Sequence, residues 1–224
     1  MRKPKAYIQM LGSIGMTYHN PILVSVGAND GITEDRVIPF CVKNGWKSIL
    51  IEPIPHLMEK CKNNLRSYVA NNKNIYFVQS AVGAKNGEID IAYMDPSLPI
   101  DPISRSIEMG KASAVDGYKF NKKFQDYLRK INVPCRTLDD IIESKTDRAT
   151  VVSIDVEGYE PNVFSGFDVK RWKPVCIIWE VKHLTKDQRR PIMRRLSDLG
   201  YNHVEFGPDC ISALNGLEKL VNGT

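Results

Sequence analysis

A glycine-rich turn and an acidic residue, each directly after an apolar run, could together hold the sugar of a nucleoside cofactor. The run Ile22–Val26 ends in Gly-Ala-Asn-Asp-Gly (27–31), and the run 48–51 ends in Glu52 and Pro53. Glycines let a backbone turn sharply and approach a ligand closely. A carboxylate at the end of the next strand can accept two hydrogen bonds from a ribose diol, as in dinucleotide sites. The pair predicts an adenosine-bearing cofactor, and the alternative is a tight turn beside a surface acid.

The charges near this turn discriminate among such cofactors. A pyrophosphate needs several free backbone N–H groups at the start of a helix. The turn has neither the third glycine of a dinucleotide motif nor the lysine of a P-loop, and Asp30 and Glu34 would repel a diphosphate. S-adenosylmethionine carries a sulfonium and an amino group, which nearby acids favour. The residues therefore favour this methyl donor over NAD or ATP.

The elements that must position these residues are strands that alternate with helices. Short apolar, β-branched runs predict buried strands at 22–26, 48–51, 75–78, 150–154 and 175–179, with two final strands at 203–206 and 210–214. Helical spacing and capping residues predict helices that begin at about Thr33, His56, Thr137, Pro161 and Thr185. The alternation predicts an α/β protein with an open, mostly parallel sheet covered by helices on both faces. Ligands bind beyond the carboxyl ends of such strands, where both the turn and Glu52 fall.

One segment interrupts this alternation. From Asp95 to about Tyr118 the periodicity disappears among prolines and glycines, and long loops inside a domain are usually functional or disordered. Helical spacing then predicts a short amphipathic helix with Phe120, Phe124, Leu128 and Ile131 on one face. We expect residues 95–132 to form an insertion or an acceptor-site lid. Before it, residues 89–93 alternate like a half-exposed strand near the edge of a sheet.

The composition is that of an ordinary globular protein. The 224 residues are 42% hydrophobic and 25% charged, which excludes disorder, collagen and coiled coil. This length predicts a single domain over 1–224, with residues 1–20 as an N-terminal extension. No apolar run approaches the roughly 20 residues of a membrane helix. The apolar start of the chain is interrupted by Gln9, Gly12 and Ser13, so we do not interpret it as a signal peptide.

The cysteines and the net charge indicate the cellular location and the kind of partner that the protein could attract. The five cysteines are odd in number and form no C-x-x-C pair, so they predict neither disulfides nor a zinc site. A reducing, cytoplasmic location is therefore expected. The net charge of +5 permits attraction to anionic partners without requiring it.

Several motifs, in one order, resemble those of a known family. They are Val26–Gly31, Ile51–Pro53, Ala81–Gly83 with Gly87, Arg136–Ile142 and Ile154–Glu160. Over about residues 22–205 the chain resembles the FkbM family of class I S-adenosylmethionine-dependent O-methyltransferases, and Ile154–Glu160 is the most specific stretch. The resemblance implies a Rossmann-like class I methyltransferase fold, with an open, mostly parallel seven-stranded sheet and helices on both faces. It also implies methyl transfer to a hydroxyl of a sugar, a glycan or a related natural product.

The resemblance assigns a donor-binding role to residues at the ends of the first three strands and of the fourth. Gly27, Ala28 and Asn29 should line the methionine and ribose parts, with Asp30 beside them. Glu52, followed by Pro53, should hold the ribose hydroxyls. The adenine should lie near Ser80 and Ala81, and Asp155 beside the methyl group.

The same resemblance makes four residues candidates for the chemical step: Asp155, Glu157, Glu180 and His183. In-line transfer depends on positioning, and a carboxylate or histidine can remove the proton of a hydroxyl. A divalent ion, Mg²⁺ or Mn²⁺, could assist, but scattered acids are a weak signature and the metal ligands stay unassigned. Asp155 could instead orient the donor's amino group. Glu157 and Glu160 could simply cap a helix.

Two other functions compete with this interpretation. Basic residues around the last predicted helix, such as Arg189 and Arg194, could contact phosphates of RNA in a ribose methyltransferase. Aromatic residues are not interleaved with them and the charge excess is small, so a nucleic-acid partner is not favoured. A catalytically silent binding module could also use this fold. The presence of the candidate site residues Glu52 and Asp155 argues against a loss of catalytic activity. The sequence does not indicate the oligomeric state.

Overall fold

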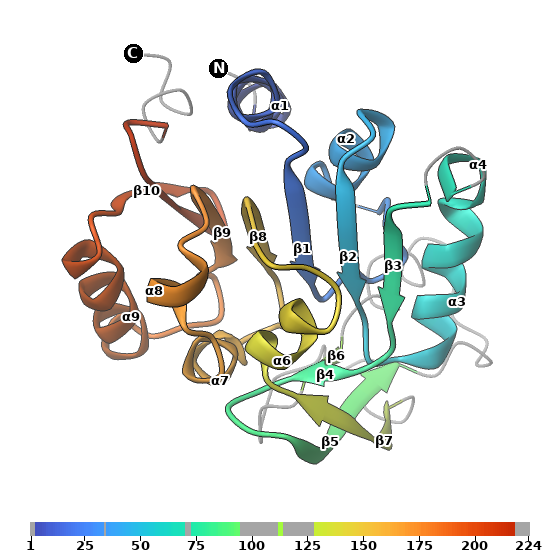
Figure 1. Ribbon diagram of the computed structural model, residues 1–224. Coiled ribbons are helices and arrows are strands. Elements are labelled where there is room, and N and C mark those ends of the chain that lie inside the picture. The colour runs from blue at the N-terminus through green and yellow to red at the C-terminus, as the bar shows by residue number, and fades with distance from the viewer. Residues whose placement is uncertain (1–2, 34, 70–72, 95–111, 114–127, 218–224) are drawn as a thin grey trace.

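The main sheet of this α/β protein has seven strands. The computed structural model describes residues 3–33, 35–69, 73–94, 112–113 and 128–217. The strand order is β10-β11-β9-β8-β1-β2-β3 (Figure 1). The bounds are Ile22–Val26 (β1), Lys47–Ile51 (β2), Ile75–Val78 (β3), Val151–Ile154 (β8), Cys176–Glu180 (β9), Asn202–Phe206 (β10) and Asp209–Ala213 (β11). These positions confirm the predicted strands.

The order of strands reverses beside β1. The chain adds β2 and β3 on one side of β1 and then places β8 and β9 on the other, all five in parallel. Strand β11 runs antiparallel to both β9 and β10. The ends of β1 and β8 therefore meet at the switch point of the sheet, where open α/β sheets bind ligands.

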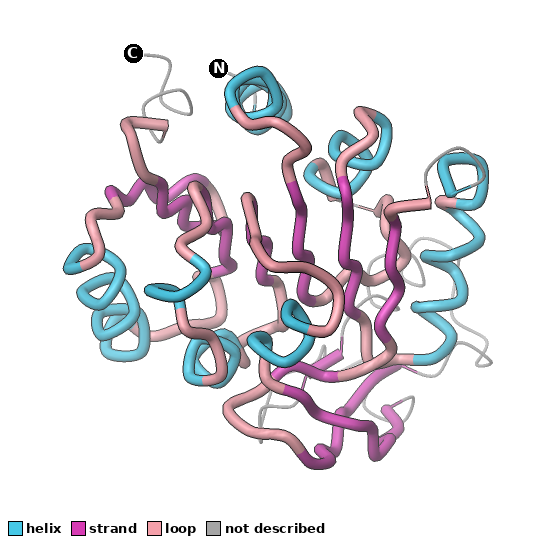
Figure 2. The backbone as a smooth tube through the Cα atoms, viewed as in Figure 1, coloured by secondary structure: helices cyan, strands magenta, loops and turns pink. Residues whose placement is uncertain are grey.

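Helices cover both faces of this sheet, as predicted (Figure 2). Side chains of a strand alternate between faces, and along β1 Leu23 enters one hydrophobic cluster while Val24 and Val26 enter the other. The first cluster includes residues of α1 (Lys3–Thr17), α2 (Val37–Lys43) and α3 (Pro55–Asn64), which the short α4 (Arg66–Val69) follows. The second includes residues of α6 (Leu138–Glu143), α7 (Glu160–Ser165), α8 (Val169–Trp172) and α9 (Lys186–Asp198).

The predicted N-terminal extension contains helix α1, which belongs to the core. Met10, Leu11 and Ile14 are fully buried and share a cluster with β1, β2, β9 and β11. The described helices include none with the length and apolar character that a membrane crossing requires. All five cysteines are free and buried.

A second, four-stranded sheet lies beyond the carboxyl ends of β1, β2 and β3 (Figure 1). Its order is β4-β7-β5-β6, with bounds Ala81–Val82 (β4), Gly87–Met94 (β5), Ala112–Ser113 (β6) and Leu128–Arg136 (β7). Strands β5 and β7 pair antiparallel over their whole common length. One face of this pair packs on Ile54 and Leu57, at the start of α3. The second sheet thus forms a wall at the ligand-binding edge of the first.

The sequence prediction was wrong for the start of β7. Leu128 and Ile131 lie in a strand and not in an amphipathic helix, and residues 128–132 of the predicted insertion belong to this strand. The apolar residues Ile131, Val133 and Cys135 recur at every second position and pack in one cluster, which is the period of a strand. Residues 89–93 pair with this strand in the second sheet. The rest of the predicted lid, apart from 112–113, lies outside the described residues.

The start of α2 also differs from the prediction. The helix begins at Val37 and not at Thr33. Asp30 accepts hydrogen bonds from the backbone N–H groups of Ile32 and Thr33, which holds the chain in a turn. Asp35 then accepts from the N–H groups of Val37 and Ile38 at 2.6 and 2.9 Å and so caps the helix.

Candidate active site

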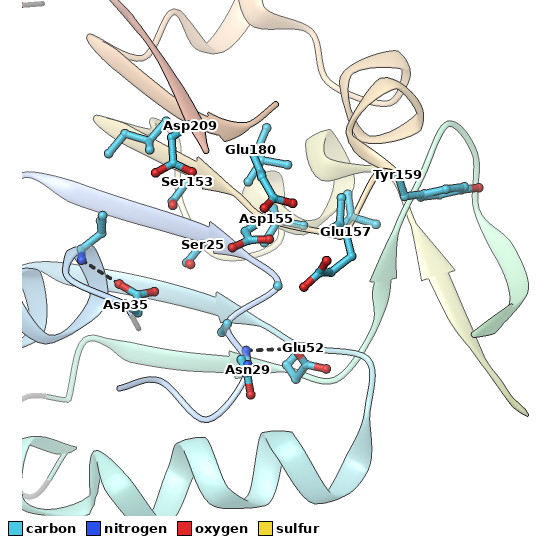
Figure 3. A pocket seen from close by; sticks show the side chains of 18 of the residues that line it. Ser25, Asn29, Asp35, Glu52, Ser153, Asp155, Glu157, Tyr159, Glu180 and Asp209 are labelled. Atoms are coloured by element: carbon cyan, nitrogen blue, oxygen red, sulfur yellow. Dashed lines mark hydrogen bonds between the residues drawn. The ribbon is translucent and has the colours of Figure 1, made fainter. Parts of the chain in front are cut away.

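A pocket of about 410 Å³ opens at the carboxyl ends of β1, β2, β8 and β9. Figure 3 shows Glu52 and Asn29 on one side of it and the carboxylates of Asp155, Glu157 and Glu180 gathered on the other. The pocket therefore lies at the predicted edge of the sheet and joins the two groups of candidate residues. Polar residues that line it include Ser25, Asn29, Asp35, Glu52, Ser80, Ser153, Asp155, Glu157, Tyr159, Glu180, Lys182 and Asp209.

The glycine turn after β1 fits tightly against the next loop. Gly27 has a φ of +80°, and a Cβ atom at this residue would lie 1.8 Å from the carbonyl oxygen of Asp155. Only glycine tolerates both the left-handed backbone and this approach. The N–H groups of Gly27 and Ala28 both donate to the carbonyl of Ile51, at 3.0 and 2.9 Å. The turn is thereby fixed between the ends of β2 and β8 and presents its backbone to the pocket.

Glu52 joins this turn to the end of β2. Its side chain is buried, its Oε2 accepts the N–H of Asn29 and its Oε1 accepts the N–H of Ile54, both at 2.9 Å. Burial raises the pKa of Glu52 to about 7, although the two N–H donors favour the ionised form. Each carboxylate oxygen keeps lone-pair capacity toward the pocket. Glu52 thus lines the pocket with oxygens that could accept hydrogen bonds from a diol.

Acidic residues dominate the opposite side. Burial, followed by the charges of neighbouring carboxylates, raises the pKa of Asp155 and of Glu180. His183 lies behind them, with its Nε2 2.9 Å from Glu157 Oε2 and 3.8 Å from Glu180 Oε2. Glu157 adopts a left-handed backbone with a φ of +53°, a conformation that is sparsely populated for residues other than glycine. The structure thus brings the four predicted catalytic residues together.

Of the other residues predicted to bind the donor, some line the pocket and one does not. Pro53, Ser80 and Ala81 line the pocket. The hydroxyl of Ser80 donates to the carbonyls of Ala81 and Pro134, so it fixes the chain between β4 and β7. Asp30 is not among the residues that line the pocket, and its carboxylate accepts hydrogen bonds from Thr33. Asp30 therefore shapes the turn.

Two pocket residues come from the two ends of the chain and were not predicted. Tyr7 of α1 donates its hydroxyl to Asp209 Oδ2 at 2.6 Å, and both line the pocket. Asp209 pairs with Glu180 in the register of β11 and β9. Because β11 is antiparallel, its first residue lies at the edge where the parallel strands end. That signal was available once the last strand was predicted, whereas the place of Tyr7 depends on how α1 packs.

Comparisons with known proteins identify the family and the fold. A family model described as the methyltransferase FkbM domain matches residues 25–202. A search of curated proteins found no significant match. The FkbM methyltransferase from Methylobacillus flagellatus KT is similar in structure, with 18% identity, 89% of this chain and 45% of that chain covered, and a TM-score of 0.56. The METTL16 methyltransferase domain has 12% identity, 93% and 65% coverage and a TM-score of 0.51.

These two solved chains are longer than the present one, which spans about half to two thirds of their length. At such identities the likeness establishes the fold. The protein has the Rossmann-like fold of class I methyltransferases. Since the family model covers most of the sequence, the chain belongs to the FkbM methyltransferase family.

Proposed function

We propose that the protein is an S-adenosylmethionine-dependent O-methyltransferase that acts on a hydroxyl of a sugar, a glycan or a related natural product. One observation carries the proposal. A single pocket holds a diol-binding carboxylate, Glu52, beside a glycine turn, and faces a group of carboxylates across the switch point of the sheet. Membership in the FkbM family supports the same reaction class.

The residues of the donor side fit the methyl donor. The carbonyl of Asp155 lies so close to Gly27 that residue 27 cannot carry a side chain. The bare backbone of the turn is thereby held at the pocket, where it would lie against the ligand. Glu52 would hold the ribose hydroxyls, and Ser80 and Ala81 would flank the adenine. The donor supplies an electrophilic methyl group on a cationic sulfonium. The acids that line the pocket, Asp35, Asp155 and Asp209 among them, favour such a cation electrostatically.

On the acceptor side, Asp155 is the residue best placed to accept the proton of a hydroxyl. It follows β8 at the switch point and faces the pocket. A general base works best when its pKa lies near the working pH, and burial together with neighbouring carboxylates raises the pKa of Asp155 toward that range. His183 contacts Glu157 and does not line the pocket. We therefore assign His183 a positioning role, in which it holds the carboxylate of Glu157 at the pocket.

Two observations support the choice of a sugar hydroxyl over an RNA acceptor. Two arginines of α9 are committed to the protein itself: Arg195 donates to the carbonyls of Phe164 and Phe167, and Arg189 donates to that of Leu184. The pocket is lined by more acids than bases, which repels phosphates. The neutral hydroxyls of a sugar meet no such repulsion.

The proposal is tested with labelled S-adenosylmethionine and a panel of free sugars, glycans and RNAs. Transfer of label to a sugar or glycan supports it, and the position of the new methyl ether is then read by mass spectrometry. Label found only in RNA would make the protein a ribose or base methyltransferase. Tight binding of S-adenosylhomocysteine without turnover on any acceptor would favour a silent binding module.

We expect the substitution Glu52→Ala to weaken S-adenosylhomocysteine binding by about 1–3 kcal/mol, because it removes charge-assisted hydrogen bonds to the ribose. Titration calorimetry measures the effect. Glu59→Ala, on the exposed face of α3, is the matched control and should bind as the wild type does. An unchanged affinity in folded Glu52→Ala protein would show that Glu52 does not contact the donor.

The affinity for S-adenosylhomocysteine should also depend on pH. The pKa of Glu52 is raised to about 7, so the carboxyl is ionised above pH 7 and becomes protonated as the pH falls through that value. Protonation removes the charged acceptor, and we expect the affinity to fall by up to about tenfold for each unit below pH 7. Glu52→Gln should bind more weakly at pH 8 and show a flatter profile between pH 5.5 and 8.5. A wild-type profile as flat as that of the variant would contradict the assignment.

A further inference from the structure

Three carboxylates from three elements converge beneath the acceptor side of the pocket. They belong to Asp155 after β8, Glu160 at the start of α7 and Glu180 at the end of β9. One oxygen of each lies within 4.8 Å of the others. Two oxygens bound to one ion at 2.0–2.6 Å can be no farther apart than about 4–5 Å. A single cation could therefore contact all three.

The described residues balance the negative charge of this group only in part: His183 Nε2 lies 3.8 Å from Glu180 Oε2, and Lys182 also acts on Glu180. Glu160 is fully buried, and its Oε1 accepts the N–H groups of Val156 and Gly158 at 3.0 and 3.3 Å. Its Oε2 is buried and has no hydrogen-bond partner in the part of the chain that the structure describes, and the same holds for Oε2 of Glu180. These bonds also show that Glu160 closes the turn before α7. The N-cap of α7, Tyr159, has no side-chain cap hydrogen bond, so the alternative role of Glu160 as a helix cap is not confirmed.

Buried carboxylate oxygens without partners are costly when the group is charged. Glu160 and Glu180 each carry such an oxygen, and with the more exposed Asp155 they lie within one ion's reach, so that shared protons or a bound cation would stabilise them. An all-oxygen set suits a hard ion such as Mg²⁺ or Mn²⁺ better than zinc, which takes nitrogen and sulfur more often. A second group of Glu157, Glu180 and His183 shares Glu180 with the first. There, however, His183 Nε2 already lies 2.9 Å from Glu157 Oε2.

We infer that Asp155, Glu160 and Glu180 form a binding site for one divalent cation, Mg²⁺ or Mn²⁺. Asp155 and Glu180 line the pocket, whereas Glu160 lies behind them. The protein ligands would thus occupy one side of the ion and leave the positions toward the pocket to water or an acceptor oxygen. In a role that rests on the proposed function, the ion would bind the acceptor hydroxyl and lower its pKa, and the hydroxyl proton would pass to the oxygen of Asp155 that does not contact the ion.

The test measures Mn²⁺ binding directly, by the loss of the electron paramagnetic resonance signal of free Mn²⁺ at pH 8. The wild-type protein should bind one Mn²⁺ saturably, and Glu160→Gln and Glu180→Gln should each weaken binding by at least about tenfold, since even outer partners of metal ligands matter that much. Glu88→Gln, an exposed carboxylate on β5, is the control and should bind as the wild type does. Circular dichroism establishes that each variant is folded.

The outcomes separate this site from the proposed function. No saturable binding by the wild type up to millimolar Mn²⁺, or unchanged affinity in folded Glu160→Gln protein, would overturn the site and show that protons neutralise these carboxylates. Saturable binding that both variants lose would establish the site, even if no acceptor in the panel is methylated. Methyl transfer that persists in the presence of a chelator would overturn the role of the ion in the reaction.

Discussion

The variant Asp155→Asn should transfer methyl groups about 10²–10⁴-fold more slowly than the wild type, the usual range for a lost general base. Asparagine keeps the shape of the side chain but cannot accept the proton of the acceptor hydroxyl. The backbone of residue 155 keeps its contact with the glycine turn, since the N–H of Asp155 donates to the carbonyl of Val26 at 3.0 Å. The glycine turn should therefore keep its shape, and most of the loss should appear in the rate constant.

Single-turnover kinetics with a saturating acceptor measures this effect. Asp147→Asn, an exposed acid before β8, serves as the matched control and should retain full activity. His183→Ala should cost a comparable factor only if the imidazole is the base and Asp155 orients it. Near-normal turnover by Asp155→Asn would show that Asp155 is not the base, and that positioning of the donor and the acceptor supplies most of the rate.

The second large effect is expected for Gly27→Ala. The added methyl group would lie 1.8 Å from the carbonyl oxygen of Asp155, and the φ of +80° is unfavourable for alanine. A backbone atom cannot yield as a side chain can, so the turn must move away from Asp155 and from Glu52. We expect donor affinity to fall by at least about 100-fold, which corresponds to about 2.7 kcal/mol, together with a lower melting temperature.

The variant Gly45→Ala separates the effect of the steric clash from the effect of the backbone strain. Gly45 has a φ of +74°, close to that of Gly27, but a Cβ atom there would meet nothing within 4 Å. Its substitution should cost only the backbone strain, about 1–2 kcal/mol of stability, and leave donor affinity intact. If Gly27→Ala binds S-adenosylhomocysteine as tightly as Gly45→Ala does, the turn can relax without disturbing the pocket.

The main sheet and its ligand-binding edge could be predicted because their signals are local. Buried parallel strands appear in the sequence as short apolar runs such as Ile22–Val26, and the residue after each run marks the functional edge. Glu52, Asp155 and Glu180 were found in this way, and the structure places all three on one pocket.

The parts that could not be predicted depend on contacts between distant segments. Strand β7 was mistaken for a helix at its start because Leu128 and Ile131 fit a helical stripe, and only pairing with β5 reveals a strand. The unpartnered oxygen of Glu160 depends on the path of residues 156–158, which take up its other oxygen. Tyr7 reaches the pocket through the packing of α1, which no short motif encodes.

The order of strands β9, β11 and β10 has a consequence for how the protein is made. Strand β10 leaves the ribosome before β11, yet β11 is the strand that separates it from β9. Until residues 209–213 emerge, β9 remains an open edge, and such edges recruit other chains. Asp209, the partner of Tyr7, arrives in the same step. A nascent chain therefore completes its pocket and protects the edge of its sheet in the same step, and a product that stops before residue 209 would expose that edge to aggregation and proteolysis.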